Sequence, residues 1–443
     1  MKRETFTSGF GLLMTMIGVA VGLGAVWRFP YMVGKFGGAA FVLFYMLVVC
    51  FIGIPALMVE WTLGRYTRLG TLGAYSKAGL PGGKIVGAFL FVIVIIATGY
   101  YSNAIGWVGF HALGELVKVV RIDINPELIL PPQEGFNLTS FVLQLTMTAL
   151  VIFFCAIVLN KGLRKGIEKT SKVIVPALFI ILIVIIARSI TLPGAGEGIR
   201  WYIGRFHLNE LTPSVMAAAL GMAFFSMSLG GTFMVIYGSY LNKEAKILKM
   251  AVFTGLGASL AGILAGFAIF PAVFAFGLEP SSGPNLIFST LPQTFSKMPA
   301  GWVFGTLFFF GLFGAAFLSD IAAFEVLVGG ITDNTKISRK KAVWGASFIV
   351  FILAVPPMIN FKIFIPWDLT FGSGMQVFGS FLAMLTAVWF IKRIELLNEL
   401  SKGQKKPVPK FFYLWMKFVV PAAILFVGIN WFLESVFHIN IFS

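Results

Sequence analysis

Glycine interrupts two apolar stretches of the sequence, at residues 20–25 (AVGLGA) and at residues 226–232 (SMSLGGT). Within a bilayer, backbone N–H and C=O groups freed by such a break persist only where protein buries them or where they line a cavity. The amide end of a half-helix favours an anion, and the carbonyl end favours a cation. A zwitterion satisfies both ends, so the paired breaks predict the binding site of a secondary transporter.

The composition indicates that the chain lies in a membrane. Of its 443 residues, 58% are hydrophobic and 12% are charged, and the mean hydropathy is +0.91. One soluble core cannot bury so much apolar surface. The net charge of +16 would suggest nucleic acid as a partner of a soluble protein, but here Lys and Arg lie in short connectors between apolar runs. We therefore expect the lipid bilayer as a partner and no nucleic acid.

The apolar runs predict an all-α polytopic protein with about 11 transmembrane helices, each about 20 residues or longer. The expected spans are 10–36, 38–62, 84–117, 139–159, 168–190, 213–240, 247–276, 301–332, 342–359, 368–391 and 411–435. Most Lys and Arg residues then fall on the side of the N-terminus. This bias predicts a multi-pass protein of the cell membrane with its N-terminus in the cytoplasm and its C-terminus outside.

The positions of the two breaks predict an internal repeat. If the first and sixth spans are broken, helices of residues 10–190 and of residues 213–391 form two five-helix units that enter the membrane from opposite sides. Residues 411–435 then form an additional helix. We expect one transporter domain over residues 1–443.

Several motifs carry a family resemblance. Residues 18–30 read GVAVGLGAVWRFP, residues 37–41 read GGAAF, and residues 225–230 read FSMSLG. With Glu60-Trp61 and Tyr100-Tyr101, they resemble the neurotransmitter:sodium symporter family over nearly the whole chain. The resemblance implies the leucine-transporter fold with a 5+5 inverted repeat, alternating access and Na⁺ as the coupling ion. Eleven spans resemble the bacterial amino-acid branch of the family.

The same resemblance implies a substrate site and two gates. Tyr101 and the backbone amides of residues 22–24 are expected to bind the substrate carboxylate. The substrate positions implied are Ala20, Gly22, Leu23, Gly24, Tyr101, Phe225, Ser226, Ser228, Gly231, Ser319, Asp320 and Ala323. The outer gate positions are Arg28 and Asp368, and the inner gate positions are Arg3, Ser239, Tyr240 and Asp333.

Three positions point to the substrate class. Monoamine carriers of the family have an aspartate where this chain has Gly22, so the glycine favours an amino acid, which brings its own carboxylate. Gly231 and Ala323 stand where larger side chains often close the pocket. A large apolar or aromatic amino acid is therefore predicted.

The implied sodium sites are altered. At the first site the Ala20 carbonyl and Ser226 remain, but Ala25 and Gly257 or Ala258 replace polar ligands, so this site is expected to be degenerate. At the second site Leu318 replaces a threonine. The ligands that can remain there are the carbonyls of Gly18, Val21 and Ala315 and the hydroxyl of Ser319, and Asp320 appears beside them.

Asp320 is a carboxylate at membrane depth, and such groups are usually functional. It is a candidate to ligate a cation, carry a proton or hold the substrate amine, and the alternative is a buried, hydrogen-bonded aspartate in a helix kink.

Three classes of function stay open. The leading interpretation is a Na⁺-coupled amino-acid transporter, with a proton-coupled or uncoupled transporter as the alternative. The second class is a membrane sensor that binds an amino acid without transporting it. An enzyme is disfavoured because no catalytic motif is evident. No cofactor is expected, and the sequence leaves monomer or dimer open.

Overall fold

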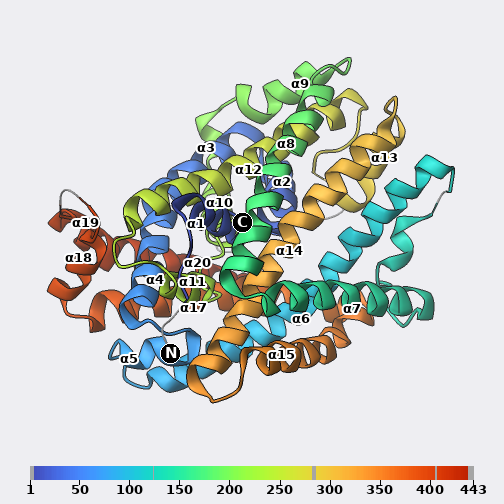
Figure 1. Cartoon of the computed structure of the whole chain (residues 1–443). Coiled ribbons are helices and arrows are strands. Elements are labelled where there is room, and N and C mark those ends of the chain that lie inside the picture. Colours follow the sequence, from blue (N-terminus) through green and yellow to red (C-terminus); the bar gives the residue numbers. More distant parts are fainter. Residues whose placement is uncertain (1–3, 123, 282–285, 405–406, 438–443) are drawn as a thin grey trace.

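The computed structural model describes residues 4–122, 124–281, 286–404 and 407–437, and every regular element in these ranges is a helix (Figure 1). Nine helices of the described residues are long and apolar enough to cross a membrane, and a bent pair adds a tenth span. The nine spans are Gly38–Thr67, Gly83–Val120, Leu138–Asn160, Leu163–Ser189, Ile247–Ala275, Gly301–Asn334, Arg339–Met358, Phe361–Phe390 and Lys410–Leu433. They match nine predicted spans within a few residues.

The bent pair is the first predicted span. Helix α1 (Gly9–Ala20) is capped at its N-terminus by Ser8, whose side chain accepts a hydrogen bond from the Gly11 amide. The chain leaves the helix at Val21 and resumes at Gly24 as far as Phe36, with a bend of 56° between the two parts. The first predicted break is therefore present.

The sixth predicted span consists of two short helices, which is why it does not count among the nine. Helix α10 (Pro213–Ser226) and helix α11 (Phe233–Ser239) are separated by residues 227–232. Within this segment Ser228, Gly230 and Thr232 have φ of +50°, +85° and +58°. A left-handed backbone cannot continue a right-handed helix, and this explains the break.

The core of the bundle is the pairing of α6 (Gly83–Val117) with α14 (Gly301–Asn334), the most extensive helix pair of the described residues. Helix α11 packs closely on α4 (Ile54–Thr67), because glycine faces backbone there. A Cβ at Gly238 would lie 2.5 Å from the Trp61 carbonyl oxygen. Small residues allow membrane helices to approach in this way.

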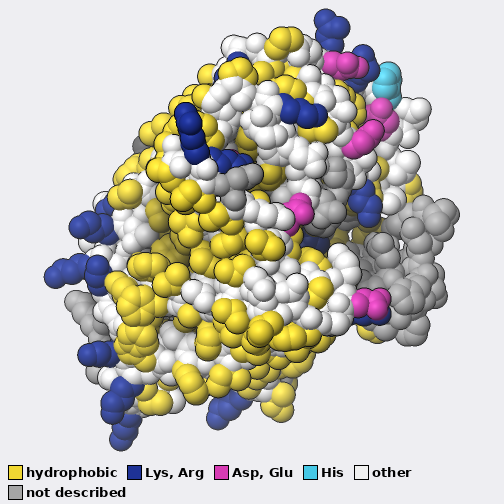
Figure 2. All heavy atoms as spheres, turned by 90° about the vertical axis from the view of Figure 1, so that its right-hand side faces the viewer, with side chains coloured by type: hydrophobic (Ala, Val, Ile, Leu, Met, Phe, Trp, Pro, Cys, Tyr) yellow, Lys and Arg dark blue, Asp and Glu magenta, His cyan; other side chains and the backbone are white. Residues whose placement is uncertain are grey.

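The outer surface is largely apolar, as expected for contact with lipid. Figure 2 shows a broad area of hydrophobic side chains across one face, with many Lys and Arg toward its margins and the few visible acidic side chains near the centre and on the right. Ile85, Val173 and Phe348 are 76%, 65% and 66% exposed, and all three lie on membrane-spanning helices. The repeat boundaries at 10–190, 213–391 and 411–435, and the orientation of the termini, stay predictions.

Candidate functional site

A cavity of about 60 Å³ lies at the break of the first span. The break contributes backbone and small residues, α6 contributes aromatic side chains, and α14 contributes Ser319 and Ala323. The full lining is Val19, Ala20, Gly22, Gly24, Ala97, Thr98, Tyr100, Tyr101, Phe225, Ser228, Phe233, Ser319, Ala323 and Gln376. The cavity therefore combines free backbone, hydroxyl groups and apolar walls, without an acidic or basic side chain in its described lining.

The Tyr101 hydroxyl group is the polar centre of this cavity. It accepts a hydrogen bond of 3.2 Å from the Leu23 amide, at the break itself. A Cβ at Gly22 would lie 2.6 Å from the same hydroxyl oxygen and would overlap the Ser319 hydroxyl. Glycine is thus required at position 22 for Tyr101, Ser319 and the break to meet, and the arrangement presents donors at one point of the cavity.

Two serine hydroxyl groups join the two breaks to α14. Ser228 donates to the Val19 carbonyl oxygen at 2.9 Å, and Ser319 donates to the same oxygen at 3.2 Å. One carbonyl at the end of α1 is therefore held from both sides. The second break is braced from behind by the buried Glu60, which accepts from the Gly230 amide and from the Ser380 hydroxyl, both at 2.9 Å.

Eight of the predicted substrate positions line the cavity, and four do not. Leu23 contributes its amide but its side chain lines a second cavity. The Ser226 hydroxyl lies 2.9 Å from the Tyr45 hydroxyl. A Cβ at Gly231 would overlap the ring of Phe233, and Phe233 is the residue that lines the cavity. The positions within the lining are Ala20, Gly22, Gly24, Tyr101, Phe225, Ser228, Ser319 and Ala323.

The fourth position outside the lining is Asp320. Its carboxylate is fully buried between three helices and accepts hydrogen bonds from the Ser102 hydroxyl at 2.9 and 3.1 Å. The thiol of Cys155, on α7 (Leu138–Asn160), lies 3.6 Å from the same carboxylate. Asp320 thus follows Ser319 in α14, and Ser102 follows Tyr101 in α6, so the two pairs lie in the same contact between these helices.

Sequence reasoning missed six lining residues. Ala97 and Thr98 lie one helical turn before Tyr101, so the helical repeat of 3.6 residues was a usable signal for both. Tyr100 belongs to a motif already noted. Val19 also belongs to a motif already noted, at residues 18–30. Phe233 and Gln376 carried no signal of their own, because Phe233 follows the second break and Gln376 comes from α17 (Met375–Leu385).

A smaller cavity of about 40 Å³ shares Tyr100, Tyr101 and Phe225 with the first. Both predicted outer gate residues, Arg28 and Asp368, line it. The Arg28 guanidinium lies 4.2 Å from the centre of the Phe225 ring. The Tyr100 hydroxyl is hydrogen-bonded to Asp368, which also lies in the field of Arg28. The aromatic side chains of Tyr100, Tyr101 and Phe225 therefore separate the two cavities.

On the side where the chain begins, the predicted inner gate residues lie among other charged groups. Asp333 accepts a hydrogen bond of 2.9 Å from the Gly70 amide. The Tyr240 hydroxyl donates to the buried carboxylate of Glu325, which also pairs with Arg339. The Ser239 carbonyl accepts from Arg68 at 3.2 Å. Arg3 lies outside the described residues.

At the predicted sodium sites, oxygen atoms that could bind a cation are present at the end of α1. Val21 leaves the helical conformation, with φ −87° and ψ 88°, and Ser319 reaches the adjacent backbone. The apolar Leu318 packs against Gly18, since a Cβ at Gly18 would lie 2.8 Å from its Cδ1. Ala20 lines the cavity, whereas Ala25 and Ala258 are buried without an oxygen in the side chain. Carbonyl and hydroxyl oxygens are suitable ligands for a hard cation.

A helical membrane protein with two broken spans around a small cavity that contains free backbone and hydroxyl groups has the architecture of a secondary transporter. The model of the family described as "Sodium:neurotransmitter symporter family" matches residues 3–119 and 134–439. The chain belongs to this family, and its fold is the leucine-transporter fold. The predicted family and fold class are confirmed.

Relatives and a solved structure extend along the whole chain. An uncharacterized sodium-dependent transporter of Haemophilus influenzae is 33% identical, over 97% of this chain and 98% of the relative. The uncharacterized sodium-dependent transporter YhdH of Bacillus subtilis is also 33% identical, with the same coverage. The crystal structure of MhsT in complex with L-phenylalanine has a TM-score of 0.83 and 32% identity, over 96% of this chain and 99% of that chain.

Proposed function

We propose that this protein transports an amino acid with a large apolar or aromatic side chain by alternating access, driven by Na⁺. The observation that carries the proposal is the neutral cavity at the break of the first span, where the Tyr101 hydroxyl and the Leu23 amide meet. A carboxylate would accept hydrogen bonds at this point, and the rings of Phe225 and Phe233 would contact an apolar side chain.

The solved structure of a related protein supports the substrate class. MhsT was crystallised with L-phenylalanine, and it aligns with 96% of this chain. The cavity of about 60 Å³ is small for such a ligand, so binding would require Phe225 or Phe233 to move outward. A cavity that closes around its substrate is typical of alternating access.

Transport into proteoliposomes tests the proposal. Purified protein is reconstituted, and uptake from a mixed amino-acid pool is measured with a sodium gradient and a proton gradient imposed separately. We expect concentrative uptake of phenylalanine-like amino acids with the sodium gradient alone. Uptake with the proton gradient alone would mean that the coupling ion is the proton and not Na⁺. Binding of an amino acid without any flux would favour the amino-acid sensor.

Asp320 bears on the coupling ion. Its carboxylate contacts Ser102 and Cys155 and is not part of the cavity lining, which argues against a contact with the substrate amine. We propose that Asp320, which follows Ser319 in α14, contributes negative charge next to the second sodium site. Asp320→Asn should then weaken sodium activation of uptake and leave the pH dependence of uptake unchanged.

The same variant separates the other roles of Asp320. If it carries the driving proton, Asp320→Asn abolishes concentrative uptake but preserves exchange, because exchange releases no net proton. Parental sodium and pH dependence in this variant would leave the aspartate with a structural role only.

A further inference from the structure

A groove of about 580 Å³ lies on the side of the membrane where the chain begins, between residues 6–13 and residues 242–253. It shares no described lining residue with the two cavities of the transport path. Its two walls are the start of α1 and the start of α12 (Ile247–Ala275), together with the loop that precedes α12.

The interior of the groove is largely apolar. Phe6 and Leu12 are buried at its base, and Leu13 and Met250 are partly buried. Phe10 and Phe253 are 58% and 49% exposed although they lie on apolar helices. Large exposed apolar side chains at this position can be covered by hydrocarbon chains of the bilayer.

The rim of the groove is basic. Lys246 and Lys249 line it and are exposed, and neither forms an ion pair with a described residue. The Lys249 ammonium lies 5.7 Å from the centre of the Phe253 ring, so a positive charge stands directly at the apolar wall. Glu244 also lines the groove, but its charge lies in the field of Arg65.

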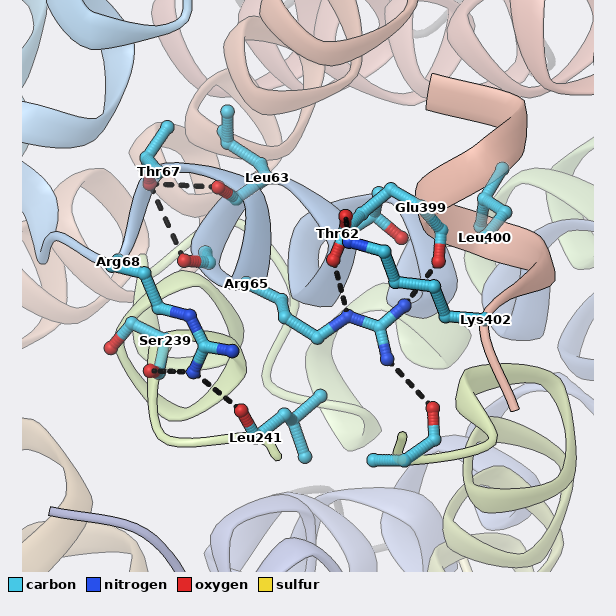
Figure 3. A network of polar contacts seen from close by, with 12 residues as sticks. Thr62, Leu63, Arg65, Thr67, Arg68, Ser239, Leu241, Glu399, Leu400 and Lys402 are labelled. Carbon is cyan, nitrogen blue, oxygen red and sulfur yellow. Dashed lines mark hydrogen bonds and ion pairs between the residues drawn. The ribbon is translucent and has the colours of Figure 1, made fainter. Parts of the chain in front are cut away.

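The walls of this groove are held by interactions that need no ligand. Arg65 donates to the Ala245 carbonyl of the loop at 2.7 Å. Arg68 donates to the Leu241 carbonyl at 2.5 Å (Figure 3). On the other wall the Thr7 amide donates to Glu168 at 2.9 Å. Such a preformed groove binds a ligand with a smaller ordering cost than a flexible one.

We propose that the groove binds one anionic phospholipid from the leaflet on the N-terminal side. An acyl chain would lie along Phe10, Leu13 and Phe253, and the phosphate would interact with Lys246 and Lys249. The long apolar stems of lysine allow the ammonium groups to reach the headgroup level. Because both lysines lack a protein partner of opposite charge among the described residues, an anionic headgroup is preferred over a zwitterionic one.

Lipid titration of the purified, delipidated full chain, followed by native mass spectrometry, tests this site. The probes are dioleoyl phosphatidylglycerol and dioleoyl phosphatidylcholine, which have the same acyl chains. We expect one tightly bound phosphatidylglycerol and weaker phosphatidylcholine. Each lysine should contribute roughly fivefold in affinity. The double variant Lys246→Gln/Lys249→Gln should therefore bind both lipids with similar affinity.

The matched control is Lys340→Gln/Lys341→Gln, which removes two exposed lysines at the start of α15 (Arg339–Ala354). It should keep the preference for phosphatidylglycerol. A second variant, Leu13→Trp, should fill the groove and weaken both lipids, with the unfolding temperature as a check of folding. Equal affinity of the parent for the two lipids, an unchanged preference in the groove variant, or the same loss in the control would each overturn the proposal.

Discussion

The cavity at the middle of the molecule and the network on its N-terminal side both bury polar groups, but with different chemistry. Around the cavity, hydroxyl groups and backbone form neutral hydrogen bonds through Tyr101, Ser228 and Ser319. On the N-terminal side, Arg65 pairs with Glu399 of α18 (Arg393–Ser401) at 2.7 Å, and its side chain is fully buried (Figure 3). Nearby, Arg339 pairs with Glu325.

This difference has a physical consequence. A neutral hydrogen bond contributes about 0.5–1.5 kcal/mol, so its donors can turn to a ligand at small cost. A buried ion pair that loses one partner leaves an uncompensated charge, which costs about 3–5 kcal/mol. The neutral hydrogen bonds around the cavity are therefore weaker contacts than the ion pairs that hold the helix ends on the N-terminal side.

The largest expected effect is on the ion pair. Glu399→Ala removes the ion-pair partner of the buried Arg65 guanidinium and should lower the free energy of unfolding by about 3–5 kcal/mol. Thermal unfolding in detergent measures it. The control is Glu134→Ala, because Glu134 and its partner Lys362 are 71% and 68% exposed and should contribute at most about 1 kcal/mol. An equal loss of unfolding free energy in the two variants would contradict the view that the buried ion pair is a strong contact.

The next effect concerns the substrate. Tyr101→Phe removes a hydroxyl that would donate to a charged carboxylate, so amino-acid binding should weaken by about 1.5–3 kcal/mol. The dissociation constant of phenylalanine, measured by calorimetry, gives the result. Tyr202→Phe is the control, because that hydroxyl donates to the Ile263 carbonyl at 3.1 Å and Tyr202 is not part of the cavity lining. An unchanged constant for Tyr101→Phe would exclude Tyr101 from the site.

A third effect sharpens the view of the cavity wall. Ala323 is the small residue of α14 that lines the cavity. Ala323→Leu should overpack the cavity when a large substrate is bound and weaken phenylalanine by about 1–3 kcal/mol, with little effect on alanine. Competition of both amino acids in the uptake assay measures the shift. Equal loss for both substrates would mean that position 323 acts on the whole fold rather than on the wall.

The sequence predicted the fold and the location of the cavity because both depend on local signals. Apolar runs and glycine breaks are properties of single segments, and Tyr101 has a recognisable neighbourhood. The rotation of the chain after the second break is not local. Three residues with positive φ separate Phe225 from Phe233, and the helical repeat cannot be continued across them. This is why Phe233 was missed, whereas Gly231 was taken from the family resemblance.

Asp320 shows the same limit at longer range. Its burial at membrane depth was predictable from its place in an apolar run, and its functional role stays a prediction. Its partners Ser102 and Cys155 lie on two other helices, 218 and 165 positions away along the chain. No sequence pattern within one helix predicts contacts between residues of three different helices. The charged network of Arg65 and Glu399, which are 334 positions apart, was missed for the same reason.

The smallest expected effect tests the neutral region itself, at Ser228. This residue combines a left-handed backbone, with φ of +50°, and a hydrogen bond from its hydroxyl to the Val19 carbonyl at 2.9 Å. Ser228→Ala removes the hydrogen bond and keeps the unfavourable backbone, so the free energy of unfolding should fall by about 0.5–1.5 kcal/mol. Ser228→Gly also removes the bond, but glycine adopts positive φ without strain, which offsets part of the loss. Chemical unfolding in detergent should therefore rank the parent first, the glycine variant second and the alanine variant last. If alanine proves as stable as glycine, the left-handed backbone carries no strain at this position.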